Sequence, residues 1–206
     1  MFSQGYAEVL HSGGYGTLSD LSLHYLRTGV TDENFISISD QIRDIAHEHG
    51  ITDIVVHQDM YALFEPRFLK AFPQNNFRLL IECGDEKNGG PEIEGSAASG
   101  IVLDVNHFNL DSTPGLLRFA ARYGKVIKEI HFSYRNHELF PHNDLGWLEE
   151  RLGVISEYVD LRCQRFICEG TQKHSKNIPD LCASLSETRT ALSGMLERLV
   201  KETYGK

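Results

Sequence analysis

Short runs of apolar residues alternate along this chain with longer segments in which apolar residues recur every three or four positions. The short runs, several of them rich in β-branched or aromatic side chains, predict seven strands. These strands cover residues 6–10, 21–26, 53–57, 77–82, 100–107, 126–132 and 165–169. The periodic segments predict amphipathic helices over residues 31–49, 60–72, 112–124, 145–159 and 177–204. The second of these helices is expected to be interrupted at Pro66, because proline removes a backbone donor.

Strands that alternate with helices predict βαβ units and a parallel sheet, hence an α/β fold. The choice is then between an open doubly wound sheet and a closed (β/α) TIM-type barrel. No strand is followed by Gly-x-Gly-x-x-Gly or by a phosphate-binding Gly-x-x-x-x-Gly-Lys, which weakens the case for a nucleotide-binding open sheet. The barrel is expected to be reduced or incomplete, with about seven parallel strands, because the segments 10–21 and 84–99 lack the pattern of a crossover helix. We expect a gap between the first and last strands. The N-terminal residues, the closing helix or the second subunit of a homodimer would cover it.

Composition narrows the class of protein further. A chain of 206 residues is long enough for one core, so residues 1–206 are expected to form a single domain. Net charge is −9, from 29 acidic and 20 basic residues, which gives no electrostatic footprint for nucleic acid. No apolar run approaches the ~20 residues that a membrane span needs. The four cysteines form no Cys-x-x-Cys pair, as is typical of reduced thiols in a cytoplasmic protein.

Candidate chemistry lies where the predicted strands end. Six of the seven strands end on or near a potential metal ligand: His24, His57, Glu82, Asp104, His131 and Glu169. The C-terminal ends of parallel barrel strands meet at one mouth, where such a group of carboxylates and imidazoles favours a divalent metal site. Each residue also has a structural alternative. Asp104 could cap a following turn, and Glu82 or Glu169 could pair with Arg78 or Arg165. No role is expected for His11, His47, His49, His137 and His174.

Three stretches resemble the xylose isomerase-like TIM barrels, the sugar isomerases and epimerases that share a fold with endonuclease IV. They are the Asp-x-x-His strand at 101–107, the segments 129–133 and 142–146, and the Glu-ending strand at 166–169. The resemblance implies a four-ligand metal site at Glu82, Asp104, His131 and Glu169. It places the additional ligands of the endonuclease branch at His24, His57, His107 and His142. Phe140 stands where that branch has an Asp, and the family's first strand and helix have no counterpart.

The same resemblance implies a sugar or sugar phosphate isomerase or epimerase that depends on a divalent metal such as Zn, Mn, Mg or Co. Glu82 and Glu169 would transfer a proton beside a metal-polarised carbonyl or hydroxyl, while His107 and Arg135 would bind the substrate. The alternative is a multi-metal phosphoester hydrolase like endonuclease IV, which would use the additional histidines. A third alternative is a barrel that binds a metal or ligand without turnover.

Overall fold

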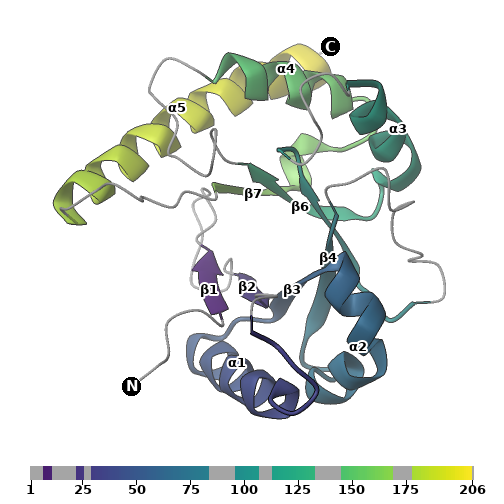
Figure 1. Ribbon diagram of the computed structural model, residues 1–206. Coiled ribbons are helices and arrows are strands. Elements are labelled where there is room, and N and C mark those ends of the chain that lie inside the picture. Colours follow the sequence, from purple (N-terminus) through teal and green to yellow (C-terminus); the bar gives the residue numbers. More distant parts are fainter. Residues whose placement is uncertain are drawn as a thin grey trace.

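The computed structural model describes residues 7–10, 22–25, 29–83, 96–106, 113–132, 145–168 and 178–205. All seven predicted strands are present, with their ends shifted by a few residues. They are β1 (Ala7–Leu10), β2 (Ser22–Tyr25), β3 (Asp53–His57), β4 (Arg78–Cys83), β5 (Gly100–Asp104), β6 (Ile127–Phe132) and β7 (Arg165–Cys168). They form one sheet in the order of the chain, and the sheet curls into an open half barrel (Figure 1).

The first strand runs in the opposite direction to the prediction. β2 to β7 pair in parallel, but β1 pairs antiparallel with β2, so Ala7 lies opposite Tyr25 and Leu10 opposite Ser22. The expectation of about seven parallel strands is therefore corrected to six parallel strands and one antiparallel edge. The physical reason is the short connection between the first two strands, since an antiparallel neighbour needs no crossover helix.

The helices cover the outer side of the curled sheet. They are α1 (Phe35–His49), α2 (Gln58–Ala71), α3 (Thr113–Tyr123), α4 (Gly146–Ile155) and α5 (Ile178–Tyr204), with a short 3-10 helix η4 (Leu161–Cys163) before β7. In Figure 1, α1 and α2 lie outside β2 to β4, and α3 and α4 lie outside β6 and β7. None of the described helices is both long and apolar enough to cross a membrane.

Two helix features depend on single residues. α1 ends at Gly50, which adopts the left-handed conformation at φ 67° and donates its backbone N–H toward the carbonyl groups of the last turn. α2 continues through Pro66, so the predicted interruption is wrong. Packing of Phe68 and Phe72 in the core holds this helix together beyond the proline, because both side chains are fully buried.

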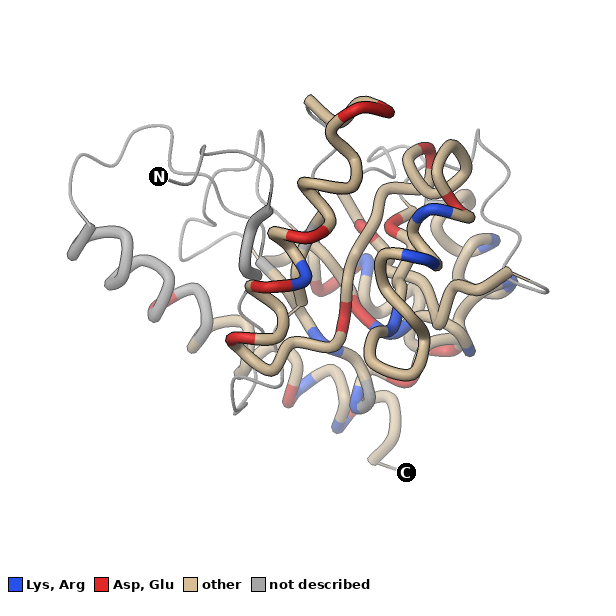
Figure 2. Tube along the Cα trace, turned by 90° about the horizontal axis from the view of Figure 1, so that it is seen from below, with Lys and Arg blue, Asp and Glu red and all other residues tan. Residues whose placement is uncertain are grey.

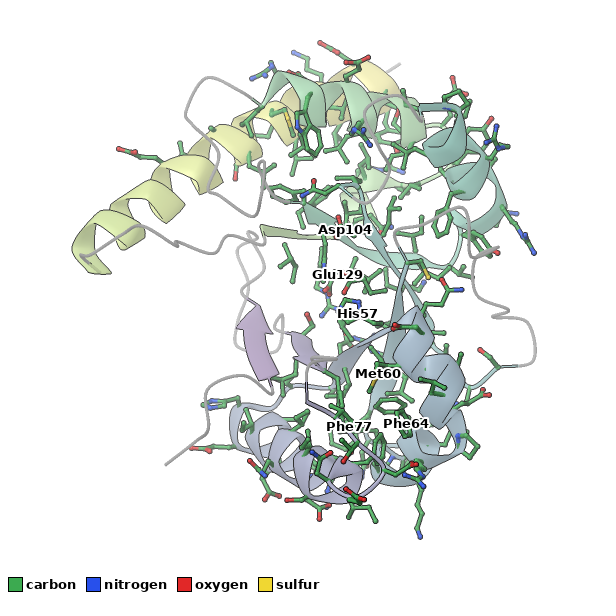
Figure 3. All side chains as sticks on the ribbon, in the orientation of Figure 1. His57, Met60, Phe64, Phe77, Asp104 and Glu129 are labelled. Atoms are coloured by element: carbon green, nitrogen blue, oxygen red, sulfur yellow. The ribbon has the colours of Figure 1, made fainter. Side chains whose placement is uncertain are left out.

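Side chains alternate along each strand between the two faces of the sheet. The helix-facing side forms the main core, which includes Leu23, Tyr25, Ile54, Val56, Leu79, Ile81, Ile101, Leu103, Ile130 and Phe132. The inner face carries a separate small apolar cluster of Val55, Leu80 and Val102. Strand alternation places Asp53 and His57 of β3, Glu82 of β4, Asp104 of β5, and Glu129 and His131 of β6 on this same inner face. Figure 3 shows the two environments: Met60, Phe64 and Phe77 lie among the helices, and His57, Asp104 and Glu129 lie within the curl of the sheet.

The sheet stays open at its two ends. In the described part of the chain, β1 and β7 are edge strands and no ladder joins them, as the predicted gap requires. The C-terminal half of α5 buries Leu192, Met195 and Leu199 and packs beside α4 and η4. Its end is fixed by Tyr204, whose hydroxyl lies 3.0 Å from the carbonyl oxygen of Val159.

Candidate active site

Glu82, His131 and His57 converge at the C-terminal end of the inner face. Oε2 of Glu82 lies 3.9 Å from Nδ1 of His131 and 4.0 Å from Nδ1 of His57. His57 and Glu82 are also partners in the register of β3 and β4. Glu82 and His131 are 5% and 0% exposed, whereas the His57 side chain is about one-third exposed. The structure therefore brings together three of the predicted ligands, from three different strands.

Asp104 ends β5 next to this group. It is the register partner of His131 on β6, so the two side chains leave the same face of neighbouring strands roughly 4.8 Å apart. Its Oδ1 atom accepts a hydrogen bond of 2.8 Å from the backbone N–H of Asn106. The turn-capping alternative thus holds for one carboxylate oxygen of Asp104, and its role as a metal ligand stays a prediction.

A buried carboxylate that the sequence analysis did not single out, Glu129, contacts the same histidine. Its Oε1 lies 2.6 Å from Nε2 of His131 and accepts a hydrogen bond of 3.0 Å from the hydroxyl of Ser22. Glu129 is fully buried and precedes His131 by two positions, on the same face of β6. The signal for Glu129 in the sequence is its alternation with His131, which puts both on one face of the strand. The strand-end pattern does not include it, because Glu129 stands in the middle of β6.

Two arginines lie at the opposite end of the inner face and neutralise carboxylates there. Arg165 contacts Asp53, and its guanidinium lies 2.7 Å from Oε2 of Glu129. Arg78 donates hydrogen bonds to both carboxylate oxygens of Asp53, at 2.5 and 2.8 Å. The alternative in which Glu82 pairs with Arg78 or Arg165 is therefore wrong for Glu82, because Asp53 and Glu129 occupy both guanidinium groups.

These contacts decide the charge of Glu129. Burial alone would raise the pKa of its carboxyl group, but the hydrogen bond and charge of His131, the charge of Arg165 and the hydrogen bond from Ser22 outweigh burial and lower the pKa below its ordinary value. The carboxylate of Glu129 thus lies between the guanidinium of Arg165, the hydroxyl of Ser22 and the ring of His131.

Several predicted site residues lie outside the described residues. They are Glu169, His107, His142, Arg135 and the side chain of His24. Their assigned roles stay predictions. Of the histidines for which no role was expected, His47 packs its ring against Phe77, with 5.2 Å between ring centroids.

The described residues fit a divalent cation in their donor chemistry and in two of their spacings. Carboxylate oxygen and imidazole nitrogen are ordinary ligands of such ions, and two atoms bound to one ion at ~2.0–2.2 Å lie roughly 3–4 Å apart. Oε2 of Glu82 has this spacing to the Nδ1 atoms of both His131 and His57. Within the described ranges, no three His, Cys, Asp or Glu side chains form a group that could hold a metal ion. A complete site would need the fourth predicted ligand, Glu169.

The arrangement of strands and helices matches a solved structure, "Structure of L-ribulose 3-epimerase". The match covers 81% of this chain and 68% of that chain, with a TM-score of 0.54 and 13% sequence identity. No family model matches the sequence, and neither does any curated protein. The structural match supports the predicted (β/α) TIM-type barrel fold, here in a reduced form.

Proposed function

We propose that this protein is a divalent-metal-dependent sugar isomerase or epimerase. The observation that carries the proposal is the approach of Glu82 to His131 at the mouth of the inner face, with Asp104 beside His131. Active sites of (β/α) barrels lie at this end of the strands. The similar fold of L-ribulose 3-epimerase supports a small sugar as the substrate.

The metal would be held by Glu82, Asp104, His131 and Glu169. When bound, the ion would polarise a substrate carbonyl or hydroxyl and so lower the barrier to removing the neighbouring carbon-bound proton. Among the described residues, Glu82 is the candidate for the base that transfers the proton. Its carboxylate is nearly buried and reaches the mouth from β4. Glu169 would act from the other side of the substrate, with His107 and Arg135 as substrate-binding residues.

A phosphoester hydrolase with two or more metals is the second candidate. It is favoured by one observation, the position of His57 within 4.0 Å of Glu82, because a four-ligand isomerase site does not need this histidine. The charge distribution counts against duplex DNA as its substrate. The chain has a net charge of −9, and Figure 2 shows acidic residues interspersed with basic ones along the described helices.

Metal stoichiometry and proton exchange separate these candidates. The purified protein would be analysed for bound metal and then incubated with two classes of substrate. Ketoses and aldoses in D₂O are followed by NMR for epimers and for deuterium at the reacting carbon, and phosphoesters are followed for cleavage. One ion per chain with deuterium incorporation supports the isomerase. Two or more ions with phosphoester cleavage supports the hydrolase, and binding without turnover on either substrate class would contradict both.

Glu82→Gln is the decisive variant. It keeps the size of the side chain but removes the base, so deuterium incorporation is expected to fall at least ~100-fold. Glu149→Gln is the matched control, because Glu149 lies on the surface of α4 and pairs with Arg198 at 3.2 Å, away from the inner face. Equal loss in both variants would show that the effect of Glu82→Gln is not specific to the site.

A further inference from the structure

We infer that Glu129 is a positioning residue that fixes the tautomer of His131, so that the lone pair of Nδ1 faces Glu82. The inference rests on the proposed function and assigns to the site a residue outside its predicted ligands. His131 stands between two carboxylates. Nε2 lies 2.6 Å from Oε1 of Glu129, and Nδ1 lies 3.9 Å from Oε2 of Glu82.

The chemistry of the imidazole ring gives the direction of this hydrogen bond. Glu129 already accepts from two donors, the guanidinium of Arg165 on Oε2 and the hydroxyl of Ser22 on Oε1, so its carboxylate is the acceptor in the contact of 2.6 Å and Nε2 of His131 carries the proton. A neutral imidazole carries one N–H and one lone pair, and the proton on Nε2 therefore places the lone pair on Nδ1. Nδ1 is the atom on the side of Glu82 and of the mouth, where a metal would bind.

The surroundings of Glu129 hold its carboxylate in place. Oε2 lies 2.7 Å from the guanidinium of Arg165, and Oε1 also accepts the hydrogen bond from Ser22. Both Glu129 and His131 are fully buried, so no water competes for the contact between them. A histidine ligand that donates its second N–H to a carboxylate is oriented and made more basic, and loss of such a partner commonly weakens metal binding 10- to 100-fold.

The first test is the tautomer itself, measured on the metal-free full-length protein. Two-bond ¹H–¹⁵N correlation spectra at alkaline pH, where imidazole is neutral, report which ring nitrogen carries the proton. The His131 signals are assigned by their loss in His131→Gln. We expect the Nε2–H tautomer in the wild-type protein. An Nδ1–H tautomer would overturn the inference without any Glu129 variant having to fold.

The second test is Glu129→Gln with Ser22→Ala as the control. The amide of the glutamine can both donate and accept, so the tautomer preference of His131 should be lost, and Mn²⁺ or Zn²⁺ affinity by titration calorimetry should fall 10- to 100-fold. Ser22→Ala removes the other hydrogen bond to the same oxygen but keeps the carboxylate, so the tautomer should persist and affinity should stay within about threefold.

The two proposals fail in different ways. Wild-type protein that binds neither ion would overturn the metal-dependent function, while the NMR spectrum would still decide the tautomer of His131. Wild-type protein that binds the ion, together with a folded Glu129→Gln variant of equal affinity, would overturn the positioning role of Glu129 and leave the proposed function standing.

Discussion

Arg165 on β7 contacts Asp53 on β3, although β4, β5 and β6 lie between these strands in the sheet. The strands of a flat sheet are ~4.8 Å apart, which would separate β3 from β7 by roughly 19 Å. The ion pair therefore exists only because the sheet curls. With Glu129 of β6 at 2.7 Å from the same guanidinium, Arg165 links the last strand to two others across the inner face.

Arg165→Met is expected to destabilise the fold strongly. Arg78 would still neutralise Asp53, but the buried Glu129 would lose its only arginine among the ion pairs of the described residues. Removing one partner of a buried ion pair leaves an uncompensated charge and costs about 3–5 kcal/mol. Urea unfolding followed by circular dichroism measures this change.

Arg198→Met is the control for that measurement. Arg198 is also an arginine paired with a glutamate, at 3.2 Å from Glu149, but its side chain is 60% exposed. An exposed pair contributes at most about 1 kcal/mol. A similar loss of unfolding free energy in the two variants would contradict the view that the contacts of Arg165 on the inner face stabilise the curled sheet.

Local sequence pattern was enough to predict β2 to β7 and the helices between them. Period-two and helical apolar patterns, the N-terminal Pro114 of α3 and the C-terminal Gly50 of α1 are all local signals. The ends of parallel strands are also local features, so the convergence of Glu82, Asp104 and His131 followed once a curled parallel sheet was assumed.

The remaining features depend on contacts between distant segments. The direction of β1 follows from its pairing with β2, and an apolar run carries no information about direction. Asp53 and Glu129 stand at the start and middle of their strands, where a carboxylate first suggests an exposed face. Arg165 reaches both only in the folded chain, because 112 positions of sequence separate it from Asp53. The continuity of α2 through Pro66 likewise depends on tertiary packing.

Asp104→Asn should weaken metal binding and leave the fold intact. The asparagine side-chain oxygen can still accept the hydrogen bond from the N–H of Asn106, so the turn after β5 is kept. The anionic ligand is lost, which should lower Mn²⁺ or Zn²⁺ affinity by at least ~10-fold. Metal content and thermal unfolding are measured together. Unchanged metal affinity would show that Asp104 serves only the turn.

Gly50→Ala tests the end of α1. Gly50 has φ 67°, a conformation in which a Cβ atom costs roughly 1–2 kcal/mol, although no atom lies within 4 Å of the position that Cβ would take. The expected loss of stability is therefore purely conformational. Gly146→Ala is the matched control, since it is equally open but has no positive φ, and as the first residue of α4 it should be neutral or slightly stabilising. Equal stability of the two variants would contradict this account of the helix end.

The alkaline limit of stability is expected to depend on Tyr25, which lies buried on β2 with its ring 5.0 Å from that of Phe68. Burial raises the pKa of its phenol, the hydrogen bond with Ser39 lowers it, and the net value is about 12 against an ordinary 10.0. Because the folded-state pKa is the higher one, the stability that Tyr25 contributes is complete below pH 10 and is lost as the pH rises through about 12.

In urea unfolding, the free energy of unfolding should accordingly fall between pH 8 and pH 12, and roughly 2–3 kcal/mol of this fall is assigned to Tyr25. Tyr25→Phe removes the titrating group, so its stability is expected to be about 1 kcal/mol lower at neutral pH, where the hydrogen bond with Ser39 is missing, and to decline less steeply above pH 10. Tyr158→Phe is the control, since Tyr158 is 41% exposed, and its profile should follow that of the wild type. A Tyr25→Phe profile parallel to the wild type over this range would show that another group sets the alkaline limit.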